Sequence, residues 1–214
     1  MAAAPAPPSA RGQRTRARLL EAGKTVFERD GFLDARITDI ATEAQVSHGA
    51  FYHYFDSKES LFQEIAEEIE VRLVSMDDIV SDEHSPDPVE RIRAANRSYL
   101  SAYKKEAKIM RVIEEVSRYN PEVRAVRIKR DDALALRLEA VIARLQAEGV
   151  ADPRIDKRYA ATALGGMVAR FAETMFVAGG RYRFEPAVEQ LTLLWANSLG
   201  IGTTPKAGRK AKSA

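Results

Sequence analysis

Apolar residues recur at helical spacing along almost the whole chain, and no segment alternates convincingly with the period of two expected of a half-buried strand. Three Asp-Pro or Asn-Pro pairs, at 87–88, 120–121 and 152–153, are favourable helix starts, with Pro at the first helical position. Gly31 and Gly179–Gly180 are expected to end helices or break the chain. The pattern predicts an all-α protein of about nine helices, three short ones in front and longer ones behind.

The expected helix boundaries follow from these signals. The first helix should end near Asp30, and Asp56 with Glu59 could form a capping box that opens the fourth helix. Residues 81–87 are expected to form a surface loop. The other predicted helical segments are about 37–44, 48–54, 88 onward, a helix ending near 119, 121–147, 154–178 and 186–199.

Composition limits the classes of protein that this pattern can represent. Of the 214 residues, 45% are apolar and 30% charged, an ordinary balance for a chain that buries a core. There is no cysteine, which excludes disulfides and thiolate metal sites and makes a reducing cytoplasm the simplest location. No apolar run is long enough to span a membrane, so a soluble protein is expected. The net charge of +2 is too small to indicate a nucleic-acid partner by itself.

Both ends of the chain are expected to be disordered. Residues 1–10 are rich in Ala and Pro without a charged side chain, and the prolines interrupt the apolar stretch that a signal peptide needs. Residues 202–214 contain four basic side chains and no acidic one. We interpret this basic tail as a solubilising end, with a weak, salt-sensitive DNA contact as the alternative.

The most informative stretch is 36–55, in which two short helical segments flank Gln45-Val46-Ser47. Two short helices joined by a tight three-residue turn have the geometry of a helix-turn-helix, whose second helix enters the major groove of DNA. Ser47 can cap the second helix and direct its free N–H groups toward a phosphate. The apolar residues expected to pack the motif are Ile37, Ile40, Ala41, Ala44, Val46, Phe51 and Phe55.

The second helix is expected to expose small and hydrogen-bonding side chains rather than charges. Gly49 and Ala50 would let the backbone approach the bases, and the Ala50 methyl could contact a thymine methyl. Tyrosine hydroxyls and histidine nitrogens suit phosphates or base edges, and Lys58 adds a cation within reach of a phosphate. For Tyr52, a half-buried position in the core is the alternative to a phosphate contact.

These residues carry a resemblance to a known family. The pattern Ile37-x-Asp39-Ile40-Ala41, followed by Val46-Ser47-x-Gly49-x-Phe51-Tyr52-x-Tyr54-Phe55-x-Ser57-Lys58-Glu59-x-Leu61, resembles the N-terminal domain of the tetracycline-repressor (TetR) family. The helix from Thr15 to Asp30 fits as well. The resemblance implies a DNA-binding domain at 11–57 and a helical effector-binding and dimerisation domain at 58–201, between the disordered tail at 1–10 and the basic tail at 202–214 that composition predicts.

The resemblance also implies which residues face DNA. Tyr52 and Lys58 are expected at backbone phosphates, whereas His48, Ala50 and His53 are expected at base edges. The full expected set is Arg36, Thr38, Ser47, His48, Gly49, Ala50, Tyr52, His53, Tyr54 and Lys58.

Two residues depart from the family pattern. Arg36 stands where the family usually has a Thr that caps the first helix of the motif, and a phosphate contact could replace that cap. Gln45 stands where the family usually has a Gly in the turn. A left-handed Gln would cost of order 1 kcal/mol relative to Gly, which packing can offset.

Charge in this part of the chain is clustered rather than abundant. Residues 9–60 contain eight basic and eight acidic side chains, yet Arg11, Arg14, Arg16 and Arg18 have no acid among them. Such an arm can reach phosphates or a minor groove, with a solvated helix start as the alternative. Two of the histidines lie five residues apart without an acid or thiol to complete a set, so neither a metal nor a cofactor is expected.

In the family the later helices bind an effector and dimerise, and the sequence of these helices adds to both hypotheses. A lipophilic or aromatic small-molecule effector is expected among Tyr99, Tyr103, Met110, Glu114, Phe171 and Met175, although such stripes are more often plain core. The last two helices mix small and large residues, as helices in close contact across a two-fold axis do. The expected dimer interface comprises Gly165, Met167, Val168, Leu191, Leu194 and Trp195.

We therefore expect a non-enzymatic, sequence-specific transcriptional regulator, a homodimeric repressor that an effector releases from a palindromic operator. No zinc-protease helix, nucleophile elbow, phosphate-binding glycine loop or dinucleotide fingerprint occurs in the chain. The alternatives are a non-specific DNA binder, which should be more basic, and a helical protein-interaction module.

Overall fold

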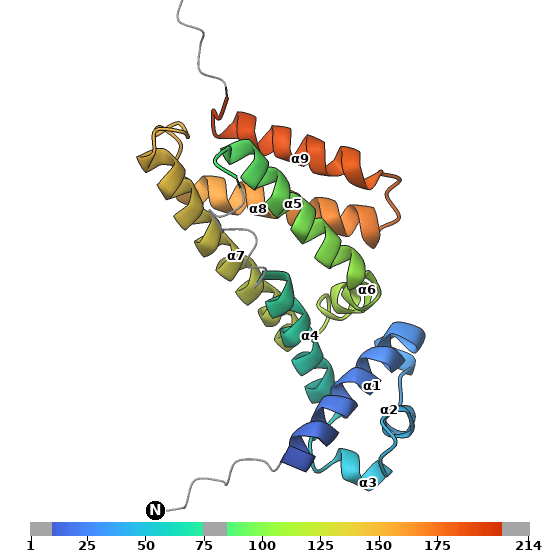
Figure 1. The fold of residues 1–214 in the computed structure, drawn as a ribbon. Coiled ribbons are helices and arrows are strands. Elements are labelled where there is room, and N and C mark those ends of the chain that lie inside the picture. The colour runs from blue at the N-terminus through green and yellow to red at the C-terminus, as the bar shows by residue number, and fades with distance from the viewer. Residues whose placement is uncertain (1–9, 75–84, 203–214) are drawn as a thin grey trace, which may run out of the picture. The chain divides into compact units, whose positions relative to one another are not determined.

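The computed structural model describes residues 10–74 and 85–202 (Figure 1). Within these ranges it contains nine α-helices and no strand, so the predicted all-α class is confirmed. The expectations for the N-terminal tail up to residue 9, for the tail from 203 on and for loop residues 81–84 lie outside the described part. No described helix is long and apolar enough to cross a membrane.

The helices form two compact units along the chain. The first unit comprises the residues up to Arg72 and Glu106–Ile128, and the second comprises Leu73–Lys105 and the residues from Lys129 on. The helices are α1 (Ala10–Asp34), α2 (Ile37–Glu43), α3 (His48–Phe51), α4 (Lys58–Val74), α5 (Pro88–Lys105), α6 (Ala107–Val116), α7 (Pro121–Ala147), α8 (Lys157–Phe176) and α9 (Phe184–Ser198). Thus α6 and the first two turns of α7 pack with the N-terminal helices, among them those expected to bind DNA.

Aromatic side chains build the core of the first unit. The ring of Phe62 on α4 packs edge-on against Phe27, with centroids 5.0 Å apart, and against Phe32 at 4.9 Å. Gly23 lets α1 approach α4, because a Cβ atom there would lie 2.7 Å from Leu61 Cδ2. Gly in a helix costs roughly 0.5–1 kcal/mol relative to Ala, and the close packing of the two helices offsets that cost.

The start of α4 differs from its prediction in one detail. Ser57 and Ser60, rather than Asp56 and Glu59, form the reciprocal cap: Ser60 N–H donates to Ser57 Oγ over 3.1 Å and Ser57 N–H donates to Ser60 Oγ over 3.2 Å. The helix begins at Lys58, so the capping residue is Ser57 and its reciprocal partner must lie three residues on.

Three other predicted boundaries are confirmed. Gly31 interrupts α1 with φ 79° and ψ 174°, a conformation that ends regular helix. Asp87 and Asn120 precede the prolines that open α5 and α7, and their Oδ1 atoms accept backbone hydrogen bonds from Val89 and Val123, each over 2.9 Å.

The predicted start of α8 at Asp152-Pro153 is wrong. Asp152 instead closes a local turn by accepting a 2.9 Å hydrogen bond from Arg154 N–H. The helix begins at Lys157, after Asp156, whose side chain accepts from the backbone N–H groups of Arg158 and Tyr159. An Asx turn and a helix cap use the same side-chain chemistry, so the local sequence did not separate them.

In the second unit α5 lies alongside α8 and α9 (Figure 1). Arg93 Nε lies 2.8 Å from Glu189 Oε1, and Arg97 Nη1 donates to Glu185 Oε1 over 2.7 Å. Residue numbers therefore rise along α5 as they fall along α9, and the two helices are antiparallel. The hydrogen bond between Arg97 and Glu185 raises the pKa of the guanidinium and lowers the pKa of the carboxyl group.

Candidate functional site

The turn between α2 and α3 has the tight geometry that the sequence predicted. Gln45 adopts φ 53°, in the left-handed region, as expected for the residue where the family has Gly. Val46 N–H donates to Ala41 O over 2.9 Å and closes the turn. Arg18 of α1 also donates hydrogen bonds to the carbonyls of Ala44 and Gln45, so the first helix supports the turn from outside.

α3 is short and anchored by aromatic side chains. Ser47 caps it as predicted, because its Oγ accepts a 3.2 Å hydrogen bond from Ala50 N–H. Phe51 is fully buried and Phe55 nearly so. Regular α-helix ends at Phe51 rather than 54, and Tyr54 N–H donates to Phe51 O in the turn that follows. The anchors fix which side of α3 faces outward.

The outward side of α3 carries the residues that the sequence singled out. His48, Gly49, Tyr52 and His53 are exposed, while Ala50 and Tyr54 are half-buried. The Tyr52 side chain is 49% exposed, which favours a surface contact over a place in the core. Its ring lies edge-on to that of His48, with centroids 5.4 Å apart. The surface therefore offers phenol, imidazole and open backbone.

The expected residues at the start of α2 lie on the surface as well. Arg36 and Thr38 are exposed, and Arg36 occupies the capping position without a side-chain cap hydrogen bond. Asp39 provides a carboxylate in the first turn, where the helix dipole favours it. The loss of the usual Thr cap is thus not replaced by a cap from the Arg36 side chain.

Lys58 has a structural environment that sequence reasoning missed. Its Nζ donates to the carbonyl oxygens of Phe32 over 2.7 Å, Ala35 over 2.9 Å and Leu33 over 3.3 Å. Three acceptors match the three protons of an ammonium group. Lys58 therefore joins the start of α4 to the segment that follows the break in α1, a contact across more than twenty residues that no local pattern signals.

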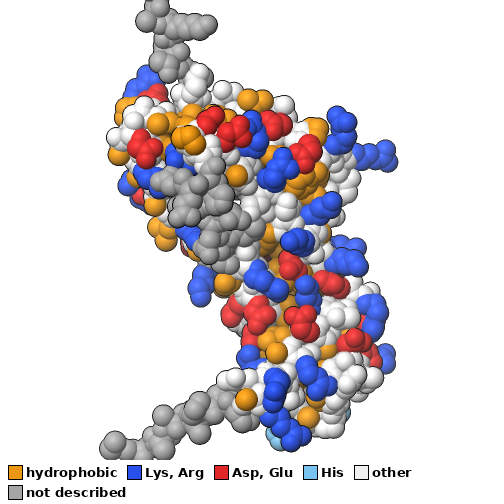
Figure 2. Space-filling model, viewed as in Figure 1, with side chains coloured by type: hydrophobic (Ala, Val, Ile, Leu, Met, Phe, Trp, Pro, Cys, Tyr) orange, Lys and Arg blue, Asp and Glu red, His pale blue; other side chains and the backbone are white. Residues whose placement is uncertain are grey.

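The arginine cluster at the start of α1 divides into two pairs. Arg16 forms a bidentate pair with Glu64 and lies over the Phe55 ring, 5.1 Å from its centroid, while Arg18 supports the turn. Arg11 and Arg14 are exposed, and among the described residues neither makes an ion pair. Figure 2 shows basic side chains gathered beside a histidine at the end of this unit, where Figure 1 places α3 and the start of α1.

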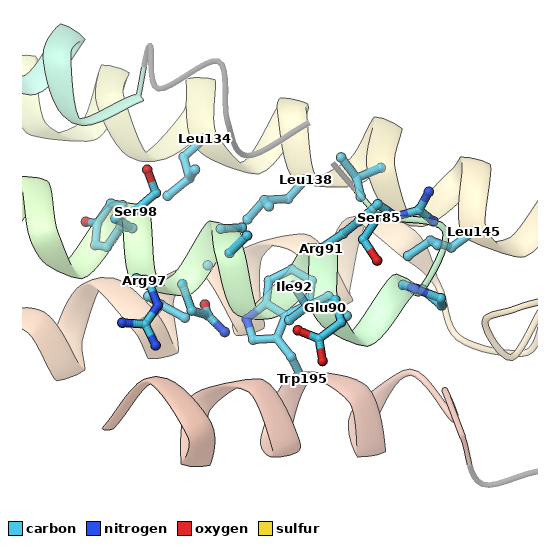
Figure 3. Close-up of a pocket in the computed structure, with 18 of the residues that line it drawn as sticks. Ser85, Glu90, Arg91, Ile92, Arg97, Ser98, Leu134, Leu138, Leu145 and Trp195 are labelled. Atoms are coloured by element: carbon cyan, nitrogen blue, oxygen red, sulfur yellow. The ribbon is translucent and has the colours of Figure 1, made fainter. Parts of the chain in front are cut away.

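The second unit contains a cavity of about 760 Å³ (Figure 3). Small-molecule sites in proteins usually have volumes of roughly 300–1,000 Å³. The cavity is formed by α5, α7, α8 and α9. Its apolar walls include Ile92, Ala95, Leu134, Leu138, Val141, Leu145, Gly165, Val168 and Trp195, and its polar side chains include Arg91, Asn96, Ser98 and Arg144.

The structure does not bring together the six residues expected around an effector. Tyr99 lines the cavity, whereas Tyr103, Phe171 and Met175 belong to the same unit without lining it. Met110 and Glu114 lie in the first unit, where Glu114 Oε1 is 2.5 Å from Arg127 Nη2. Because an aromatic or Met stripe at helical spacing serves equally well as plain core, spacing did not identify the residues around the cavity. Those it missed lie mainly on α5 and α7.

The expected dimer residues are also divided. The chain's own helices bury Gly165, Val168, Leu191 and Trp195. A Cβ atom at Gly165 would lie 2.8 Å from Leu138 Cδ1, so this glycine serves the packing of α8 on α7. Met167 is half-buried, and Leu194 is 50% exposed. Tyr159 and Leu193, which were not predicted, add exposed apolar surface on α8 and α9.

No group of three or more His, Cys, Asp or Glu side chains that could hold a metal ion occurs within residues 10–74 and 85–202. The described residues form a helix-turn-helix with an exposed second helix and, in a second unit, a cavity sized for a small molecule.

This combination defines a helix-turn-helix DNA-binding protein. The family model described as "Bacterial regulatory proteins, tetR family" matches residues 19–65, which contain α2, the turn and α3. A second family model, described as "Tetracyclin repressor-like, C-terminal domain", matches residues 85–173. The chain belongs to the TetR family, whose members are non-enzymatic DNA-binding regulators of transcription.

Individual relatives agree with this assignment. The HTH-type transcriptional regulator YdgC of Bacillus subtilis is 27% identical over 189 residues, which cover 86% of this chain and 92% of YdgC. The HTH-type transcriptional repressor NicS of Pseudomonas putida is 43% identical over 56 residues, 26% of either chain. A structure from Mesorhizobium loti assigned to the TetR family shares the fold, with a TM-score of 0.76 at 18% identity over 89% of this chain and 98% of that one.

Proposed function

We propose that the chain is a cytoplasmic, effector-responsive repressor that binds a palindromic operator as a homodimer. The outward side of α3 is the observation that carries this proposal. His48 and Gly49 stand exposed on α3, which Phe51 anchors from behind, and Tyr52 and His53 stand exposed directly after it. A rigid helix that presents backbone and hydrogen-bonding side chains suits the major groove.

The exposed residues suggest a division of contacts. Tyr52 is proposed to bind a phosphate, and His48, Ala50 and His53 to read base edges, with Gly49 allowing close approach. Arg36, Thr38, Ser47 and Tyr54 would add contacts beside them. Arg11 and Arg14 are proposed to reach phosphates or the minor groove, because their charges are not used in ion pairs within the described part of the unit. Lys58 would chiefly hold the domain together.

The dimer is proposed to form through exposed parts of α8 and α9. Leu193 and Leu194 are 48% and 50% exposed, and Tyr159 on α8 is 80% exposed. Ala163 and Gly166 are exposed small residues on α8, where a partner helix can approach closely. An isologous contact of these faces would give a two-fold dimer with recognition helices about 34 Å apart, one turn of DNA.

The DNA-binding proposal is tested on the DNA upstream of the protein's own gene. Tyr52→Phe is expected to weaken binding in fluorescence anisotropy, because it removes one hydroxyl from the proposed contact while leaving the ring in place. Tyr119→Phe is the matched control, since Tyr119 is 51% exposed and lies outside the motif. If excess random DNA abolishes binding, the protein is a non-specific DNA binder. If the protein does not bind the upstream DNA at all, a protein-interaction module is favoured.

The dimer is tested by sedimentation velocity. Replacing both Leu193 and Leu194 by Asp is expected to convert the dimer to a monomer with unchanged helix content. Leu136→Asp is the control, because Leu136 is 68% exposed and lies on α7, which is not part of the proposed face. A wild-type protein that sediments as a monomer, or a double variant that remains dimeric, would contradict the proposed interface.

A further inference from the structure

The cavity of the second unit has a buried hydrogen-bond donor without an acceptor. Trp195 is 6% exposed and lines the cavity, and none of the described residues accepts a hydrogen bond from its Nε1–H. A buried N–H group normally has a partner, because an unpaired donor loses its hydrogen bonds to water without replacement. In Figure 3 the Trp195 side chain extends from α9 toward α5. The orphaned donor therefore marks a place for an acceptor on a ligand.

The antiparallel register of α5 and α9 brings this donor level with the first turns of α5. Asn96 Nδ2 donates to Thr192 Oγ1 over 3.3 Å, and Trp195 lies one turn further along α9. One turn further in the opposite sense on α5 are Arg91 and Ile92, which also line the cavity. Trp195 and Arg91 thus lie within about one helical turn of the same level along the two helices.

α7 contributes a second cation to the cavity. Glu148 Oε2 lies 3.8 Å from Arg91 Nη2, and Glu148 Oε1 lies 3.8 Å from Arg144 Nε. The Glu148 carboxylate therefore lies beside both guanidinium groups, and both arginines line the cavity. The contacts are long for charge-assisted hydrogen bonds, which are usually about 2.7–2.9 Å. A ligand carboxylate at this place would compete with Glu148 for the two guanidinium groups.

The wall that α7 and α8 contribute beyond Arg144 is apolar. Along α7 the cavity wall extends from Leu134 to Leu145, about 16 Å at the helical rise. Leu138 and Val141 lie between these ends, and Val168 of α8 adds to the wall. A ligand that fits has one acidic end and a long apolar body.

We infer that the effector is an elongated apolar carboxylate. Its acid group accepts hydrogen bonds from Trp195 and the Arg91–Arg144 pair, and its apolar body lies along α5 and α7. The inference rests on the proposed function in treating this cavity as the effector site. Straight-chain and aromatic acids share the required chemistry, and the experiment separates them.

Binding is measured on the DNA-free protein, where the tryptophan itself reports, because the chain contains only one. Dodecanoate below its micelle concentration and 4-butylbenzoate are the probes, with dodecanol as the uncharged control. At least one of the two acids is expected to change Trp195 emission and to bind at least tenfold more tightly than dodecanol in calorimetry. The acid that binds more tightly shows whether the effector is a straight-chain or an aromatic acid. The inference would be overturned if dodecanol bound with the same affinity as both acids. It would also be overturned if neither acid bound.

Three variants test the acid end by calorimetry with the tighter acid. Trp195→Phe keeps an aromatic ring but removes the N–H, and is expected to weaken binding roughly tenfold. Glu148→Gln removes the competing carboxylate and is expected to tighten binding about threefold, a gain that misfolding cannot produce. Arg97→Gln is the control, because Arg97 lines the cavity but pairs with Glu185. Wild-type affinity in both Trp195→Phe and Glu148→Gln would exclude this arrangement.

Release of operator DNA is measured separately. Acid binding without release would leave the ligand assignment in place and contradict the proposed effector response. If the protein bound operator DNA with or without the acids and did not bind either acid, the ligand assignment would be contradicted. The DNA-binding function would remain intact.

Discussion

The Lys58 ammonium donates a hydrogen bond to the Phe32 carbonyl oxygen over 2.7 Å and lies 4.7 Å from the centroid of the ring of the same residue. The two contacts attach the first turn of α4 to the chain that follows Gly31. A lysine in a DNA-binding motif is readily interpreted as a phosphate ligand, but here its three donors already have carbonyl acceptors.

Lys58→Met should therefore destabilise the first unit even without DNA. Loss of charge-assisted hydrogen bonds to the carbonyls of Phe32 and Ala35 is expected to lower the free energy of unfolding by about 2 kcal/mol. Denaturant unfolding followed by circular dichroism measures this difference. Lys108→Met, at an exposed position on α6, is the matched control and should change stability by less than about 0.5 kcal/mol. Equal stability of the two variants would contradict a structural role for Lys58.

The left-handed residue of the turn gives a prediction with the opposite sign. Gln45 has φ 53°, and Gly at this position should raise the free energy of unfolding by about 0.5–1 kcal/mol because it removes the steric cost of the Cβ atom. Gln45→Ala keeps the Cβ atom and should show no such gain. Thermal unfolding of the two variants provides the comparison, and a Gly variant that melts below the Ala variant would disprove the argument.

Gly23 should tolerate no side chain without loss of stability. Its added Cβ atom would lie 2.7 Å from Leu61 Cδ2 and 3.0 Å from Ile65 Cδ1, so Gly23→Ala must displace both side chains in the core. Overpacking of this kind costs about 1–3 kcal/mol, more than the gain in helix propensity. Gly49→Ala, where no atom lies within 4 Å, is the control for stability and should be neutral or stabilising. Calorimetric melting of both variants tests the contrast.

The contribution of the turn before α8 to stability should depend on pH and be lost in acid. The side-chain hydrogen bond from Arg154, followed by that from its backbone N–H, lowers the pKa of Asp152 from 3.8 to about 2. Because the folded-state pKa is the lower one, the contribution is present above the unfolded pKa and is lost as the pH falls through about 2.

An NMR titration of the Asp152 carboxyl group measures this shift. Arg154→Gln should move the midpoint part of the way back toward 3.8, since the backbone N–H of residue 154 still donates. Arg158→Gln, at an exposed neighbouring position, should leave it unchanged. A wild-type midpoint near 3.8 would refute the proposed hydrogen bonding.

The features that sequence predicted well depend on neighbours along the chain. Ser47, Asp87 and Asn120 cap helices because the acceptor side chain and the donor N–H are two or three residues apart. Gly31 ends regular helix for the equally local reason that it adopts a positive φ. The family resemblance rests on the same short-range pattern, and for that reason it located the helix-turn-helix.

Features that need tertiary packing were not predictable. Leu191 and Leu194 lie three residues apart in one apolar stripe, yet the first is buried and the second half exposed, a difference that depends on which helices pack against α9. The acceptors of Lys58 and the orphaned N–H of Trp195 likewise depend on distant segments. The assignment of α3 residues to DNA contacts remains a prediction.

The support that Arg18 gives to the turn has an evolutionary consequence. Arg18 binds the carbonyls of Ala44 and Gln45 from another helix, and so helps to hold a backbone shape that a glycine would adopt without assistance. The identities of residues 18 and 45 are thereby interdependent. Sequence drift that removes the arginine should restore selection for glycine in the turn, so related chains should vary at these two positions together.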